Sequence, residues 1–183
     1  MSRAARRAAG ARWLVLALLL VLAGALGEAS AAQDDLALHR ECGYCGMDRQ
    51  AYGFSRMLVR YLDGAEAGTC SLRCTLVELD AHPGRAVKVV LAADRDTREL
   101  VDAASATWVI GGRKRGVMTA RAKWAFATRE GAEAFVRAHG GALATYDEAR
   151  AAARQDLAKD LEAEKAERRA RPFGCAGPAA AAP

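Results

Sequence analysis

The spacing of its cysteines constrains this chain more than any other feature. Cys42 and Cys45 form a C-x2-C pair, and Cys70 and Cys74 form a C-x3-C pair further along the chain. Disulfides within such close pairs would enclose very small loops, which restrict the unfolded chain little. Metal ligation or thiol redox chemistry therefore explains these pairs better than structural bridging does.

The amino terminus has the three parts of a secretory signal peptide. Four arginines precede an apolar run over residues 13–26, and the small residues Ala29-Ser30-Ala31 follow it. We predict a signal peptide over residues 1–31, cleaved after Ala31, which exports the chain to the periplasm. The apolar run is shorter than the membrane span of about 20 residues. Retention of the leader as an uncleaved membrane anchor is the alternative.

Export would change both the charge and the redox environment of the chain. Loss of the leader arginines and Glu28 lowers the formal net charge from +5 to +2. No basic patch interleaved with aromatic residues remains, so nucleic acid is not an expected partner. The compartment is oxidising, and the odd number of cysteines leaves at least one unpaired. We assign no role to Cys175.

The same order of expected elements occurs twice along the chain. Strand, strand, helix and strand are expected first over residues 54–61, 65–69, 72–81 and 87–92. The same order is expected again over residues 107–110, 123–127, 129–139 and 142–146. This repetition predicts an α+β protein with one metal-binding domain over 41–146, made of two ββαβ units at about 41–95 and 102–146. Asp94 and Asp96 fall on the connector and are expected to be solvated.

The composition changes after the second unit. Residues 147–171 are rich in Ala and charged residues and have few large apolar side chains, which predicts a charged helix that extends into solvent. Residues 172–183 are rich in Pro, Gly and Ala, which predicts a flexible tail.

The residue types around the cysteines favour a soft metal ion. Met47 adds a thioether two residues after Cys45, and a mixed thiolate and thioether set suits Cu(I). Ser71 is positioned to cap the first helix, which would place Cys74 in its first turn and lower the pKa of that thiol. The four cysteines also have the outline of a closed zinc site, so Zn is the alternative metal.

Other candidates carry less chemistry. Met118 follows a glycine-bounded loop, where the residues alone favour a methionine that fills a gap in the core. Met57, Trp108 and Trp124 are expected in the core, and His39 is near enough to Cys42 to be a reserve ligand. The chain has no recognisable catalytic triad, phosphate-binding glycine loop or paired-carboxylate site, so we do not expect an enzyme.

Several motifs, in their order, resemble the NosL family of exported copper chaperones that help to assemble nitrous oxide reductase. The resemblance covers about residues 41–146 and rests on Cys42-Gly43-Tyr44-Cys45-Gly46-Met47, Thr69-Cys70-Ser71, residues 102–111, Gly116-Val117-Met118, and residues 135–141. It implies a pair of ββαβ units, similar also to part of organomercurial lyases. It further implies an accessible Cu(I) site with one cysteine, Cys45 or Cys42, and one methionine, Met118.

The chain departs from this family in three respects. No cysteine follows the leader, so a lipid anchor is not indicated, and Cys74 and the charged carboxy-terminal helix are additions to the common pattern. Our hypothesis is a metallochaperone that delivers Cu(I) to a periplasmic copper enzyme, or to its assembly factors. Membrane contact is expected only if the leader is retained. A thiol-disulfide oxidoreductase that uses Cys42 and Cys45, and a structural zinc module that binds another protein, are the rival hypotheses.

Overall fold

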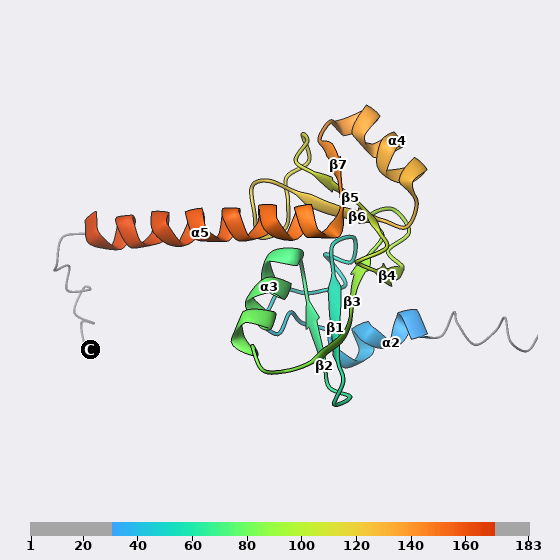
Figure 1. Cartoon of the computed structure of the whole chain (residues 1–183), viewed down its shortest axis with the longest axis horizontal. Coiled ribbons are helices and arrows are strands. Elements are labelled where there is room, and N and C mark those ends of the chain that lie inside the picture. Colours follow the sequence, from blue (N-terminus) through green and yellow to red (C-terminus); the bar gives the residue numbers. More distant parts are fainter. Residues whose placement is uncertain (1–30, 171–183) are drawn as a thin grey trace, which may run out of the picture.

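The structure, a computed structural model, describes residues 31–170. The elements in chain order are α2 (Ala31–Leu38), β1 (Met57–Tyr61), β2 (Glu66–Thr69), α3 (Leu72–Ala81), β3 (Val87–Ala93), β4 (Leu100–Asp102), β5 (Thr107–Ile110), β6 (Lys123–Phe126), α4 (Arg129–His139), β7 (Ala142–Ala144) and α5 (Tyr146–Ala170) (Figure 1). The predicted signal peptide, the predicted tail and Cys175 lie outside the described residues, apart from Ala31. No helix within 31–170 combines the length and the apolar character needed to cross a bilayer.

The strands within the described residues form two small antiparallel sheets. One has the order β2-β1-β3-β4 and the other has the order β6-β5-β7. In each sheet, the first strand of a ββαβ unit lies between the second and the third, with the helix in the connection. The α+β fold of two ββαβ units is thereby confirmed.

The two unit helices begin in the same way. The Ser71 hydroxyl accepts a hydrogen bond from the Cys74 N–H (3.5 Å), and the Thr128 hydroxyl accepts one from the Gly131 N–H (3.1 Å). Each hydroxyl satisfies a backbone donor that the first helical turn leaves free. Helix α4 ends at His139 and is capped by Gly140, whose φ of 75° is readily adopted only by glycine.

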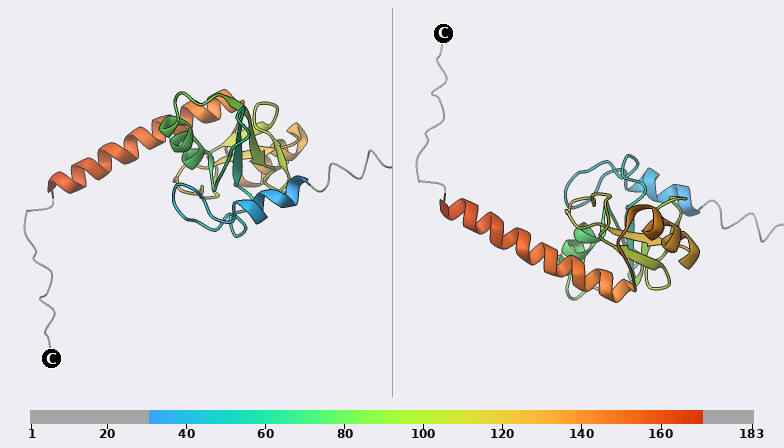
Figure 2. Two further views of the ribbon diagram at one scale, coloured as in Figure 1. Left: turned by 90° about the horizontal axis from the view of Figure 1, so that it is seen from below. Right: turned by 90° about the horizontal axis from the view of Figure 1, so that it is seen from above.

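Helix α5 is only partly the solvated extension that its composition predicts. Ala149, Ala152 and Ala153 are buried at its beginning, because small side chains allow the helix to lie close to the two units. Arg154 also donates two hydrogen bonds of 2.8 Å to Asp80 on α3. The later turns are exposed and project from the body of the molecule (Figures 1 and 2).

The connector between the units contains two features that the sequence did not predict. Strand β4 extends the first sheet, and Asp94 is buried rather than solvated. One Asp94 oxygen accepts hydrogen bonds from the Asp96 and Thr97 N–H groups, and the other accepts one from Ala127 (2.7 Å). Asp94 therefore links the end of β3 to the start of α4.

Candidate metal centre

The first cysteine pair lies on a tight turn before β1. The Cys42 N–H donates to the Met47 carbonyl, and the Gly46 N–H donates to the Cys42 carbonyl, both at 2.9 Å. Gly46 has a φ of 71°, which a side chain would disfavour and which lets the chain reverse direction. This closed turn brings Cys42 and Cys45 to the same side of the segment.

The second pair lies where β2 passes into α3. Cys70 follows the last residue of the strand, and Cys74 lies in the first turn of the helix, as the expected Ser71 cap requires. A hydrogen bond of 3.0 Å from the Gly43 N–H to the Gly68 carbonyl joins the two cysteine segments.

The four thiol groups form one cluster. The sulfur of Cys45 lies 3.5 Å from that of Cys70 and 3.9 Å from that of Cys74, and the Cys70 and Cys74 sulfurs are 3.6 Å apart. All four sulfurs lie within 4.8 Å of one another, and all four cysteines are free of disulfides. A tetrahedral ion with metal–sulfur bonds of about 2.3 Å needs sulfurs roughly 3.8 Å apart. The cluster therefore has the dimensions of a metal site.

The cluster is closed on most sides. Cys42, Cys70 and Cys74 are at most 2% exposed, whereas Cys45 is partly exposed. A ligand from another molecule can therefore approach the sulfurs from the side of Cys45.

Contacts among the thiols shift the pKa values of Cys42, Cys70 and Cys74. The thiols of Cys70 and Cys74 stabilise the Cys42 thiolate and lower its pKa. Hydrogen bonding with the Cys42 and Cys74 thiols raises the pKa of Cys70. Hydrogen bonding with Cys42, together with burial, raises the pKa of Cys74 to about 12. The lowered pKa expected for Cys74 from its place at the helix end is therefore wrong. The neighbouring Cys42 thiolate and burial raise the pKa at this position.

The sequence comparison identifies the family of this chain. Residues 34–153, more than half of the chain, match the sequence model of NosL. The chain belongs to the NosL family. Among solved structures, the copper chaperone NosL from Shewanella denitrificans is similar at 24% sequence identity, over 59% of this chain and 87% of that chain, with a TM-score of 0.47. A comparison with curated proteins finds no significant match.

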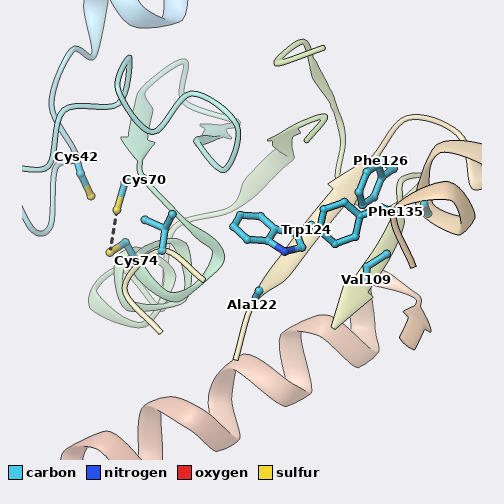
Figure 3. Close-up of a cluster of buried hydrophobic side chains, with 10 residues drawn as sticks. Cys42, Cys70, Cys74, Val109, Ala122, Trp124, Phe126 and Phe135 are labelled. Carbon is cyan, nitrogen blue, oxygen red and sulfur yellow. Dashed lines mark hydrogen bonds between the residues drawn. The ribbon is translucent and has the colours of Figure 1, made fainter. Parts of the chain in front are cut away.

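The second unit of this NosL-family chain forms a wall beside the cysteines. Val117, Trp124 and Phe135 belong to the same buried cluster as Cys42, Cys70 and Cys74. Figure 3 shows Trp124 and Phe135 together with these three cysteines. Trp124 is 2% exposed, and its ring centroid lies 6.4 Å from that of Phe135. The candidate metal site therefore lies at the junction of the two units, although only the first unit provides cysteines within the described residues.

The two candidate methionine ligands differ in burial. Met47 is partly buried and packs against the cysteine cluster. Met118 is 36% exposed and has a φ of 57°, while Val117 beside it packs into the cluster. The exposure of Met118 argues against the gap-filling core role that the residues alone favour. Ligation by Met47 and Met118 stays a prediction.

Other expected residues take structural positions. Met57, Trp108 and Trp124 are buried, as predicted. The His39 ring lies 3.6 Å from the Glu66 carboxylate and does not belong to the cysteine cluster.

A buried charged network lies beside the site, and the sequence does not predict it. Asp35, Arg49 and Arg56 are at most 4% exposed, and Asp35 accepts hydrogen bonds from both arginines. Charged residues in polar segments are usually solvated, so composition gives no signal for this network. Only the packing of α2 against the first unit reveals it.

Proposed function

We propose that this chain is an exported metallochaperone that binds Cu(I) at the four-cysteine cluster and delivers it to a periplasmic client. The clustering of four sulfurs within 4.8 Å carries the proposal. Thiolates and thioethers favour Cu(I) over harder ions. Membership of the NosL family, which handles copper and is not a family of enzymes, supports a binding role without catalysis. Nitrous oxide reductase, or a factor that assembles it, is the client that we propose.

The geometry suits capture and release by ligand exchange. Cys70 and Cys74 lie on ordered backbone and are fully buried, so they can retain a metal ion. Cys45 is partly exposed, so a client thiolate or imidazole can approach the ion there and replace it. We propose that Met47 and Met118 contribute thioether ligands at this edge of the site. A copper ion would then pass to the client without becoming free in solution.

A structural zinc site is the second candidate, because the sulfur spacing favours it. Sulfur separations of 3.5 to 3.9 Å are close to the edges of a tetrahedral thiolate site. Zinc bound to all four cysteines would be retained rather than transferred. The chain would then be a zinc-stabilised module that binds another protein.

An anaerobic competition titration distinguishes these functions. The reduced protein is titrated with Cu(I) and with Zn(II) against chelators of known affinity, alongside Cys45→Ser and Met118→Leu. We expect tight Cu(I) binding by the wild type, a large loss in Cys45→Ser and a smaller loss in Met118→Leu. Equal Cu(I) affinity in all three proteins would contradict the ligand assignment. Folding that depends on Zn(II) would favour the zinc module, and a reductase activity that requires Cys42 would favour the oxidoreductase.

A further inference from the structure

Arg49 is a fully buried arginine that connects the two cysteine segments. Its guanidinium donates hydrogen bonds to the carbonyls of His39, Thr69 (3.1 Å) and Met57 (2.9 Å). His39 belongs to the segment that leads to Cys42, and Thr69 immediately precedes Cys70. One rigid, planar group therefore fixes the backbone of both segments relative to β1.

The chain leaves room for this guanidinium at Gly68. A Cβ atom at Gly68 would lie 2.7 Å from the Arg49 Cζ atom and 2.5 Å from the His39 Cβ atom. Both distances are shorter than van der Waals contact allows. The absence of a side chain at Gly68 thus permits the Arg49 guanidinium to lie against the end of β2.

Arg49 also brings a positive charge close to the thiols. Asp35 accepts hydrogen bonds from Arg49 (2.8 Å) and from Arg56 (3.0 Å). Cys42 is among the groups that act electrostatically on Arg49. A metal ion with charge +1 bound by two thiolates has a net charge of −1. The positive charge of Arg49 opposes it in sign.

We propose that Arg49 is the positioning residue of the metal site. Its hydrogen bonds set the separation of the two cysteine segments, and its charge stabilises thiolates in a buried setting. The identity of the bound ion, Cu(I), rests on the proposed function, but the preorganisation of the thiols does not. The Asp35 carboxylate on α2 holds Arg49 in place, so the segment before the C-x2-C motif is also required for the site.

Arg49→Lys is the test variant and Arg56→Lys is its matched control. Both arginines are buried and share Asp35, but the hydrogen bonds from Arg56 to described carbonyls reach Gly53 and Arg98 rather than the cysteine segments. Lysine keeps the charge and loses the planar set of donors. Cu(I) affinity and the affinity for phenylarsine oxide, which bridges neighbouring thiols without a metal, are measured for each protein. Urea unfolding shows the fraction that is folded.

We expect Arg49→Lys to lose about 10- to 100-fold in both affinities, the range typical of residues that orient metal ligands. Arg56→Lys should stay close to the wild type in both. Wild-type affinities in folded Arg49→Lys, or equal losses in the two variants, would overturn the proposal. If Arg49→Lys does not fold, Gly68→Ala serves as the second test, because it retains Arg49 but displaces its guanidinium group. Unchanged affinities in Gly68→Ala would also overturn the proposal. A wild type that captures the arsenical in an Arg49-dependent manner but does not bind Cu(I) would refute only the proposed function.

Discussion

The starts of α3 and α4 share one backbone arrangement but carry different chemistry. In both, a hydroxyl at the cap position accepts a hydrogen bond from the N–H three residues later. In the first unit, Cys70 directly precedes the cap residue and Cys74 lies three positions after it. In the second unit, the corresponding residues are Ala127 and Gly131.

This difference shows that the repeated fold sets where two side chains lie, whereas the identity of those side chains determines whether they can bind a metal. A strand that leads into a capped helix places two side chains near each other in either unit, and only the first unit has thiols there. The second unit provides the apolar wall, with Trp124 and Phe135 beside the sulfurs. If metal chemistry is confined to the first unit, changes at the start of α3 should weaken Cu(I) binding and matched changes in the second unit should not.

Loss of a thiol at the start of α3 should have the largest effect. We expect Cys74→Ser to weaken Cu(I) binding by about 100-fold or more, because each thiolate of such a site contributes roughly 3 kcal/mol. Gly131→Ala changes the corresponding position of α4 and should leave Cu(I) affinity unchanged. Competition titration against a Cu(I) chelator measures both. A similar affinity in the two variants would mean that Cys74 is not a ligand.

Crowding at the end of β2 should have the next largest effect. Gly68→Ala introduces a methyl group that overlaps with Arg49 and His39, so we expect a loss of about 2 kcal/mol in the free energy of unfolding. Gly84→Ala is the control, because a Cβ atom there meets nothing within 4 Å. Urea unfolding of the two variants measures the difference. A loss in Gly84→Ala as large as that in Gly68→Ala would argue against the close packing described here.

Removal of the two helix caps should separate stability from metal binding. We expect Ser71→Ala and Thr128→Ala each to cost about 1 kcal/mol of unfolding free energy, because each exposes a backbone donor of the first turn. Only Ser71→Ala should also weaken Cu(I) binding, since its helix carries Cys74. Thermal unfolding and Cu(I) titration of both variants test this expectation. Weakened copper binding in Thr128→Ala alone would contradict it.

The link between the units should produce a small dependence of stability on pH. Burial would raise the pKa of Asp94, but hydrogen bonds from the backbone of Ala127, Thr97 and Asp96 outweigh it and lower the pKa. The carboxylate therefore stabilises the fold fully above the ordinary pKa of about 4 for aspartate, and this contribution is lost as the pH falls through the lower pKa of the folded state.

Urea unfolding of the wild type and of Asp94→Asn at about pH 5 and about pH 3 measures this contribution. We expect the wild type to lose more stability on acidification than the variant. An equal loss in both proteins would show that Asp94 does not contribute to the acid sensitivity.

The repeated elements could be predicted from the sequence because their signals are local. The helices α3 and α4 follow from a hydroxyl residue before an amphipathic run, and β5 follows from a short β-branched and aromatic run. The burial of Asp94 and the start of α5 depend on contacts between distant segments. A charged residue and a row of alanines give no local sign of such contacts.

Only part of the site could likewise be predicted from the sequence. Spacing identified the four cysteines as candidate ligands, and the fold brings all of them together. Spacing could not predict Arg49, whose role depends on carbonyl groups from three segments. Nor could it predict the raised pKa of Cys74, which results from the nearby thiol groups rather than from its own helix.

X-ray absorption spectroscopy of the copper-loaded protein tests the proposed site most directly. We expect copper to stay bound as Cu(I) through desalting, with only sulfur in its first coordination shell and with that shell altered in Cys45→Ser. A first shell dominated by nitrogen or oxygen, or the loss of copper on desalting, would contradict a Cu(I) site at Cys42, Cys45, Cys70 and Cys74.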